Sequence, residues 1–446
     1  MAGPAQQGSH DQDPHPGAGS SHPGADLRDL VPLIQGTADS VRRIRAIVEQ
    51  DSAVVGADEL RYVSPLGQGG FGVVFKCRYT PAPGNMRASL EKLTGRPAAD
   101  GSFTVAVKKL KGAAETRLGM EAAHAAANGT PGEDLAAKAA REHAEAVAEF
   151  AHEVLMLKKL AHPNVIGYVG CAVFQGARAP GGADGDDEDG DEQLALVLEY
   201  AQYGSLKDMI ARSSRGLAHA YQLAEGLQWC HDIARGMDYL HHCTPPIMHR
   251  DLKPGNVMLC AVDGRRVAKV ADFGLAALCL ERRKIVARQA TIALSRAGDG
   301  QRSRVYKQFN TTGGVGSLHY MAPENYRGEP YGDHVDQYSF AIILYEVLLR
   351  QRAYAGEYLT EVQIADAAAG AKQLRPALPK KWPTEVKELL ARCWHPSPAE
   401  RPSFKPIAAQ IKELLASPSA DRVLKALAAG GKMGVLEKLG LRSVGQ

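Results

Sequence analysis

A polar stretch enclosed by apolar residues constrains the fold more than any other part of the sequence. It reads IMHRDLKPGNVML and occupies Ile247–Leu259. Its two ends have the apolar character of buried strands, and solvated surface loops are rarely enclosed in this way. The pattern therefore predicts a polar site held on a rigid support inside a folded domain. The polar side chains that fall within eight positions are His249, Arg250, Asp251, Lys253 and Asn256.

The order of the predicted elements indicates an α+β protein with two lobes. Residues 61–416 form one continuous unit. Its first part, about 61–200, contains short apolar runs such as FTVAVKKL and LALVLEYA, which are typical of strands. From about 204 to 416, apolar residues recur at helical spacing, as in YQLAEGLQWCHDIARGMDYLHHC. Strands followed by helices favour a small strand-rich lobe and a large helical lobe.

Other segments differ from this unit in composition. Residues 1–25 are rich in Gly, Pro, His and Ser, and we expect them to be disordered. Residues 26–60 carry apolar residues at helical spacing, which predicts a helical extension that packs on the next domain or binds a partner. Residues 179–193, APGGADGDDEDGDEQ, are acidic and predict a disordered insert. Residues 417–446 form a weakly amphipathic C-terminal tail.

The composition excludes several classes of protein. With 45% hydrophobic and 23% charged residues among 446, the chain has an ordinary globular composition. Its formal net charge of +3 gives no reason to expect binding to nucleic acid or to an anionic membrane. None of the seven cysteines forms a C-x-x-C pair, which favours reduced thiols in the cytosol or nucleus. The longest apolar run, Phe340–Leu349, is too short to span a bilayer. We therefore expect a soluble, cytoplasmic protein.

A glycine-rich turn and a strand lysine suggest a phosphate site in the strand-rich part. LGQGGFGVV places Gly67, Gly69 and Gly72 between two predicted strands, where backbone N–H groups can approach an anion. Dinucleotide folds have the same spacing, but there a helix follows the glycines, whereas VVFKCRY is typical of a strand. Lys108 ends the strand VAVK. Glu153, on a downstream helix, is its predicted partner, because a lone buried ammonium tends to lose its proton.

Four side chains in the second part suit phosphoryl transfer. Asp251 is the only carboxylate in HRDLKPGN and can accept a hydroxyl proton as a general base. Lys253 can neutralise a phosphoryl group during transfer. Asn256 and Asp272, the latter in KVADFGLA, offer hard oxygen ligands. So few ligands suit Mg²⁺, which fills its remaining positions with phosphates and water.

Together these motifs resemble the eukaryotic protein kinase catalytic domain over about 350 residues. The Gly-rich loop, VAVK, the helix glutamate, HRDLKPGN, DFG and APE follow the order of that family. The resemblance implies a two-lobed kinase fold whose small lobe is an antiparallel sheet plus one helix. It also implies ATP and Mg²⁺ as cofactors and proteins as substrates. The enclosed loop is then explained, since phosphoryl transfer needs a base, a cation and a metal ligand at one point.

The resemblance implies a role for each matching position. The glycines would cover the ATP phosphates, and Lys108, paired with Glu153, would hold the α- and β-phosphates. Asp251 would orient the substrate hydroxyl. Adenine would contact Leu66, Val74, Ala106 and the hinge residues Glu199 and Ala201 after the gatekeeper Leu198; the metal ligands would be Asn256 and Asp272; the packed spine would include His249, Phe273 and Asp336; and Glu324 with Arg401 would form a buried ion pair.

Two distances depart from the family pattern. Lys108 and Glu153 are 45 residues apart, more than is usual, and an Ala-rich insert is expected to lengthen the helix of Glu153 at its N-terminal end. In a resting state this helix could be shifted outward, with the ion pair broken. The activation segment, 272–324, is also long.

Smaller features indicate the kind of kinase. Lys253 after HRDL and Ser317 in GSLHYMAPE resemble serine/threonine kinases. DQYSFAIILYEVL and CWHPSPAERPSF resemble the tyrosine-kinase-like group, which includes Raf-like and mixed-lineage-like kinases. The expected function is therefore serine/threonine phosphorylation in intracellular signalling. Thr311 or Thr312 is a hypothetical activating phosphosite, because an arginine such as Arg250 can chelate a phosphate group.

Three other interpretations stay open. The chain could be a dual-specificity kinase, a pseudokinase that acts as a scaffold, or a small-molecule phosphotransferase of the same fold. A pseudokinase typically lacks at least one of the catalytic residues, and this sequence retains them. The APE segment, which resembles the platform for a protein substrate, argues against a small-molecule phosphotransferase.

Overall fold

The computed structural model of the chain describes residues 54–68, 72–82, 86–110, 133–174, 193–215, 220–278, 318–417 and 420–430. Several predictions fall outside these ranges. They concern the disordered segment 1–25, most of the helical extension and of the acidic insert, Gly69, Ser317, and the phosphosites Thr311 and Thr312.

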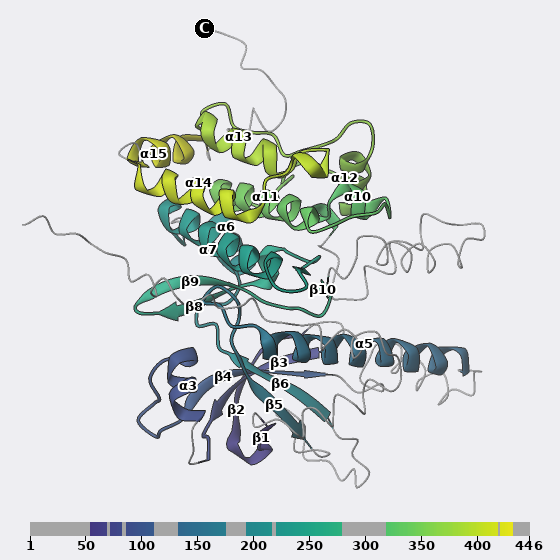
Figure 1. The fold of residues 1–446 in the computed structure, drawn as a ribbon, viewed down its shortest axis with the longest axis vertical. Coiled ribbons are helices and arrows are strands. Elements are labelled where there is room, and N and C mark those ends of the chain that lie inside the picture. Colours follow the sequence, from purple (N-terminus) through teal and green to yellow (C-terminus); the bar gives the residue numbers. More distant parts are fainter. Residues whose placement is uncertain are drawn as a thin grey trace, which may run out of the picture.

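The chain forms the two predicted lobes, and the α+β fold class is confirmed. Figure 1 shows a strand-rich lobe below and a helical lobe above, with the hairpin of β8 and β9 between them. The small lobe contains β1 (Val54–Val55), β2 (Leu60–Gln68), β3 (Gly72–Tyr79), α3 (Met86–Thr94), β4 (Phe103–Leu110), α5 (Glu133–Lys159), β5 (Tyr168–Phe174) and β6 (Gln193–Glu199). The large lobe contains α6 (Leu206–Arg215), α7 (Leu223–His241), β7 (Ile247–Met248), η5 (Pro254–Asn256), β8 (Val257–Val262), β9 (Arg265–Val270), β10 (Ala277–Leu278), η6 (Leu318–Tyr320), α10 (Pro323–Tyr326), α11 (His334–Leu349), α12 (Glu361–Ala369), α13 (Thr384–Cys393), η7 (Pro398–Glu400), α14 (Phe404–Ala416) and α15 (Ala420–Gly430).

The small-lobe sheet has the strand order β1-β5-β6-β4-β3-β2. All its neighbouring strands are antiparallel except β1 and β5, which are parallel. Because side chains alternate along a strand, Val105 and Val107 of β4 lie in the core, whereas Ala106 and Lys108 point to the opposite face. The sheet therefore has one core face and one face available to a site.

The large lobe is built around two central helices. Every residue of α11 from Val335 to Leu348 is buried, so this helix lies in the core of the lobe. This helix contains the apolar run Phe340–Leu349, which therefore has a place inside the lobe. Helix α7 packs against it and contributes Trp229 among its fully buried side chains. No helix in the described ranges is both long and apolar enough to cross a membrane.

The predicted small lobe needs two corrections. It has a second helix, α3, whose Leu90 is 1% exposed and lies in the core beneath the sheet. It also begins before residue 61, because Val54–Val55 pair with Cys171 and Ala172 of the edge strand β5. The prediction that the helical extension continues to residue 60 is therefore wrong, since two β-branched valines that reach a sheet edge form a strand there.

Two predicted boundaries also differ from the structure. Gln193, placed at the end of the acidic insert, is the first residue of β6. Part of the predicted tail is a helix, α15, that belongs to the large lobe. Its Val423 and Leu427 lie one helical turn apart on the same face and both join the core. The lobe thus extends beyond the predicted boundary at residue 416.

Candidate active site

The pairing register of three strands places four side chains on the face of the small-lobe sheet that borders the candidate active site. Val74 of β3 pairs with Lys108 of β4, and Ala106 pairs with Leu198 of β6. Directly paired residues, and residues two apart on one strand, share a face of the sheet. Val74, Ala106, Lys108 and Leu198 therefore lie on one face, opposite the small-lobe core. All four are partly exposed, as expected for side chains that border a cleft.

The glycine-rich turn lies at the edge of this face. Gly67 pairs with Val74, and Leu66 beside it leaves 45% of its surface exposed. A Cβ atom at Gly72 would lie 3.0 Å from the carbonyl oxygen of Lys109, so the strand pairing favours glycine there. A Cβ at Gly67 would meet nothing within 4 Å, so packing among the described residues does not require glycine at this position.

Lys108 lies between two carboxylates. Its Nζ donates to Glu153 Oε2 at 2.6 Å and to Asp272 Oδ1 at 3.2 Å. Glu153 comes from α5 in the small lobe, whereas Asp272 follows β9 in the large lobe. The lysine therefore connects the two lobes at the predicted phosphate site.

The electrostatics of these three groups follow from their burial. Burial by itself would lower the pKa of Lys108, but Asp272 and Glu153 outweigh it and raise the pKa, which keeps the ammonium charged. Glu153 is 2% exposed, and burial raises its pKa against the attraction of Lys108. The side chain of Asp272 is 42% exposed, so the attraction of Lys108 dominates and lowers its pKa.

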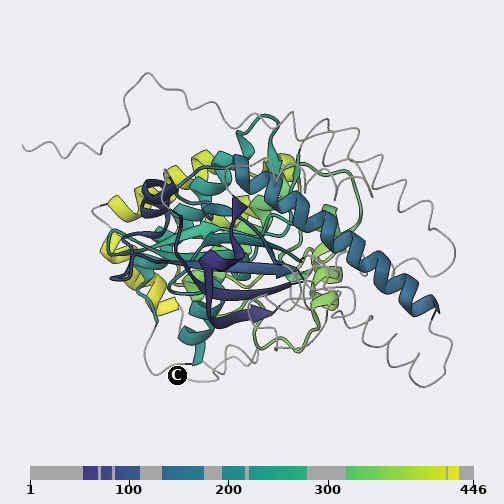
Figure 2. The same ribbon diagram turned by 90° about the horizontal axis from the view of Figure 1, so that it is seen from below.

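Helix α5 combines an extended end with an inward position. It begins at Glu133, so it is lengthened at its N-terminal end, as the sequence predicted. Figure 2 shows this end projecting beyond the body of the molecule. From Ala146 to Leu157 its buried side chains pack into the protein, and Glu153 reaches Lys108. The outward shift considered for a resting state is therefore not the state described here.

The enclosed polar stretch forms a loop between strand β7 and strand β8. Asp251 Oδ2 accepts hydrogen bonds from Lys253 Nζ at 2.6 Å and from Asn256 Nδ2 at 2.9 Å. Asn256 Nδ2 also reaches the backbone oxygen of Asp251. Both contacts use the same carboxylate oxygen, Oδ2, and no other described residue is hydrogen-bonded to Oδ1. The loop thus fixes the carboxylate without using up its capacity to accept a proton.

The β8–β9 hairpin brings the two predicted metal ligands together. Val257 pairs with Val270, so Asn256 immediately before β8 and Asp272 just after β9 lie at the same end of the hairpin. The backbone N–H of Ala271 donates to the Asn256 carbonyl at 2.9 Å. Since the Asn256 amide nitrogen donates to Asp251, its Oδ1 can serve as a ligand. One amide oxygen and one carboxylate fit the sparse protein coordination that Mg²⁺ accepts.

Two residues of the site have backbones in the left-handed region. Arg250 has φ +65° and Asp272 has φ +64°. Such conformations cost about 1–3 kcal/mol each in non-glycine residues and persist where surrounding contacts enforce them. Asp336, which is fully buried, supplies one such contact, because its carboxylate accepts from the backbone N–H groups of His249 and Arg250, both at 2.9 Å.

The remaining spine contacts support the segment around Asp272. The ring centroids of His249 and Phe273 are 5.4 Å apart, and both side chains are fully buried. His249 Nε2 lies 3.0 Å from the carbonyl oxygen of Ala271, which can only accept, so Nε2 carries the proton. Behind this site, Arg401 contacts Glu324 through two hydrogen bonds of 2.6 and 3.0 Å.

Two features of the hinge region were not anticipated from the sequence. The Glu199 side chain is buried and pairs with Lys269 of β9 at 2.7 Å, and its Oε2 also accepts from the Gly167 backbone. Lys76 lies 4.7 Å from the ring centroid of Tyr200, which precedes the hinge residue Ala201. Nothing local in the sequence identifies Glu199 as the partner of Lys269, which lies 70 residues further along the chain.

The fold has two lobes, and a lysine, carboxylates and an amide converge between them. A model of the protein kinase domain family matches residues 123–414, and the chain belongs to that family. The matched range does not include the glycine-rich turn or Lys108. Lys108 joins the site through its contacts with Glu153 and Asp272 described above.

Curated relatives carry serine/threonine kinase names. The chain is 32% identical to the serine/threonine-protein kinase CTR1 of Arabidopsis thaliana over 64% of this chain and 29% of CTR1. It is 31% identical to the serine/threonine-protein kinase STY17 of the same plant, over 62% of this chain and 39% of STY17. With the serine/threonine-protein kinase VIK, also from Arabidopsis thaliana, it shares 33% identity over 60% of this chain and 51% of VIK. The matches thus span about half or less of each relative.

Proposed function

We propose that the chain is a protein serine/threonine kinase that transfers the γ-phosphoryl group of ATP to hydroxyl groups of proteins. The single observation that carries the proposal is the contact of Lys108 with Glu153 and Asp272, because it joins the nucleotide side of the cleft to the catalytic side. Serine/threonine specificity is supported by the names of the relatives and by Lys253 in the catalytic loop.

The proposed mechanism assigns one task to each group. Lys108 holds the nucleotide phosphates, and Glu153 keeps its ammonium in place. Asp251 accepts the proton of the substrate hydroxyl, and Lys253 offsets negative charge on the transferred group. Asn256 and Asp272 would hold Mg²⁺, which supplies charge neutralisation of the phosphates when bound. Positioning and electrostatics account for most catalysis of phosphoryl transfer, which suits a site made of fixed charges.

Residues outside the described ranges enter the proposal as well. Gly69 would complete the phosphate-covering turn with Gly67 and Gly72. Thr311 or Thr312 would carry an activating phosphate. Loss of both threonine hydroxyls should then lower activity, and unchanged activity would exclude them. A cytoplasmic location is proposed too, supported by the burial of six cysteines among the described residues and by the lack of a C-x-x-C pair in the sequence.

The test compares the same substitution, aspartate to asparagine, at two positions: Asp251 in the loop before β8 and Asp263 in the turn between β8 and β9. Asp251→Asn removes the proposed base but keeps the shape, and should lower phosphate transfer from radiolabelled ATP to a generic basic protein by about 10²–10⁴-fold. Asp263→Asn makes the same change at an exposed turn with φ +48°, a conformation asparagine tolerates, and should leave transfer unchanged. Equal activity of Asp251→Asn and the unchanged chain would remove the basis of the proposal.

Phosphoamino-acid analysis of the product separates the specificities. Phosphoserine and phosphothreonine alone are expected. Phosphotyrosine in addition would favour dual specificity, which is the stated activity of one relative, the dual specificity protein kinase splA of Dictyostelium discoideum, 31% identical over 59% of this chain. No transfer from the unchanged, folded chain would favour a pseudokinase scaffold.

A further inference from the structure

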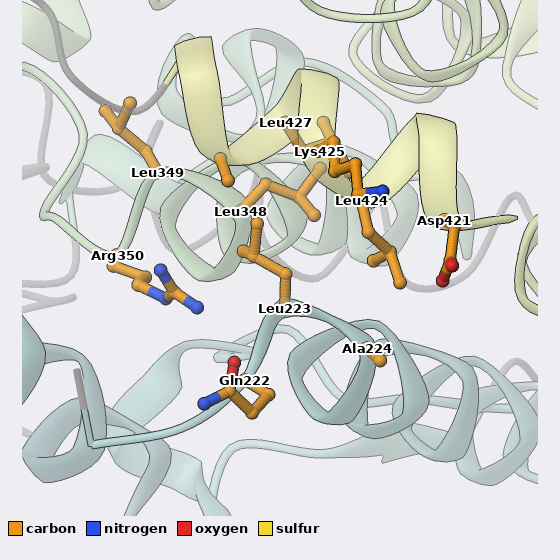
Figure 3. Close-up of a pocket in the computed structure, with 11 residues that line it drawn as sticks. Gln222, Leu223, Ala224, Leu348, Leu349, Arg350, Asp421, Leu424, Lys425 and Leu427 are labelled. Carbon is orange, nitrogen blue, oxygen red and sulfur yellow. The ribbon is translucent and has the colours of Figure 1, made fainter.

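A cavity of about 480 Å³ lies in the large lobe, where α15 crosses the start of α7 and the end of α11. Its volume falls within the range of about 300–1,000 Å³ that is common for ligand sites. Figure 3 shows Leu223, Leu348 and Leu424 pointing toward one another, with Arg350 and Asp421 on opposite sides of them. Leu223 and Leu348 are buried, whereas Leu424 is only partly covered. The described residues thus leave an apolar surface incompletely filled.

The polar rim of this cavity has unsatisfied groups. Arg350 donates from Nη2 to the Tyr221 carbonyl at 3.0 Å, but its Nε is buried and has no partner among the described residues. Its φ of +57° is a conformation that favours glycine, and burial lowers the pKa of its guanidinium. Asp421 and Lys425 also line the cavity, and within the described ranges neither has an ion-pair partner. The rim therefore presents both signs of charge around the leucines.

We propose that the cavity is the docking site of the chain's own C-terminal segment, residues 431–446. This segment follows α15 directly, and Ala428, three residues before it, lines the cavity. Its sequence, GKMGVLEKLGLRSVGQ, places Val435, Leu436 and Leu439 on one helical face. Leu436 is six residues beyond Gly430, which allows a reach of about 20 Å at roughly 3.3–3.6 Å per residue.

The charges of the segment match those of the rim. Glu437 and Lys438 adjoin the apolar residues. Glu437 supplies the acceptor that Arg350 Nε lacks, and Lys438 supplies a partner for Asp421. Gly430 and Gly431 at the exit of α15 allow the chain to reverse direction there. The segment would thereby complete the large lobe, independently of the proposed kinase activity.

Disulfide trapping in the full chain tests this proposal. Leu424→Cys with Leu436→Cys places one cysteine in the cavity wall and the other in the segment. The matched control is Arg422→Cys with Leu436→Cys, because Arg422 lies on the same helix, is exposed and does not line the cavity. Under mild oxidation the first pair should form an intrachain disulfide at least about tenfold faster than the control. The six described native cysteines are buried, which limits competing reactions.

A second measurement avoids changing the folded core. Leu436→Asp with Leu439→Asp alters only the segment, and should increase hydrogen exchange in peptides that contain Leu349 and Leu424 by several-fold. Equal trapping rates in the two cysteine pairs, together with unchanged exchange, would overturn the proposal and leave the cavity to a separate ligand. Disulfides that form between chains would also overturn it, because a second copy would then supply the segment.

Discussion

The buried ion pair of Glu324 and Arg401 supports a quantitative prediction about stability. The two residues are 77 positions apart, and each is 3% exposed. Arg401 Nη1 and Nη2 contact the two carboxylate oxygens at 2.6 and 3.0 Å. The same guanidinium donates to the backbone oxygens of His395 and His334, both at 2.9 Å. Arg401 therefore connects the start of α10, the start of α11 and the turn after α13.

Glu324→Ala should lower the free energy of unfolding by about 3–5 kcal/mol, because the guanidinium stays buried with two carbonyl partners and no counter-charge. Glu324→Gln keeps one oxygen acceptor but loses the charge. Its cost should be intermediate, about 1.5–3 kcal/mol, the usual value of a hydrogen bond to a charged group. Either loss is a large share of the 5–15 kcal/mol that stabilises a typical domain.

Urea unfolding followed by circular dichroism measures these differences. Glu329→Ala is the matched control, because Glu329 also makes two short hydrogen bonds to an arginine, Arg327, but at 48% and 39% side-chain exposure. An exposed pair contributes about 0–1 kcal/mol. If Glu324→Ala costs no more than Glu329→Ala, burial does not decide the strength of this pair and the reasoning is refuted. Transfer activity per folded molecule should change little in either variant.

Three further predictions follow from the site and the core. The pKa of His152 is lowered to about 4 by burial and by the charge of Arg250, so the unfolded chain, with a histidine pKa of about 6.5, binds more protons between these values. The contribution of His152 to stability is present above pH 6.5 and is lost as the pH falls toward 4. His152→Gln should therefore remove about 2–3 kcal/mol of the decline in the free energy of unfolding between pH 7 and 4.5. Parallel curves of unfolding free energy against pH for the two chains would contradict this. Leu427→Ala should cost about 2–5 kcal/mol in urea unfolding, since Leu427 is fully buried, and a cost below 1 kcal/mol would mean that α15 is not part of the core. Lys108→Met should lower kcat by roughly 10²–10³-fold, as for other groups that stabilise developing charge, and unchanged kcat in a steady-state assay would exclude this role.

Local sequence was sufficient for the parts of the site that lie close together in the chain. Asp251, Lys253 and Asn256 occur within six residues, so their convergence needs only a tight loop between two strands. Asp272 was identified from the motif KVADFGLA, and the pairing of β8 with β9 in the structure places it at the same end of the hairpin as Asn256. The run FTVAVKKL was likewise predicted as a strand, and β4 (Phe103–Leu110) occupies it.

Contacts between distant segments were less accessible to sequence reasoning. The spacing of Lys108 and Glu153 left open whether the pair is formed, and only the inward packing of α5 decided it. The contact of Glu199 with Lys269 had no local signal, because it depends on how the hinge meets the β8–β9 hairpin.

The sequence by itself indicated the chemistry proposed for this protein, since the side-chain types and their short spacings suit a base, cations and metal ligands. Tertiary structure decided which distant groups meet and where the lobes end, as α3, β1 and α15 show. The physical reason is that a short segment reveals its preferred local conformation, whereas its burial depends on surfaces supplied by the rest of the chain.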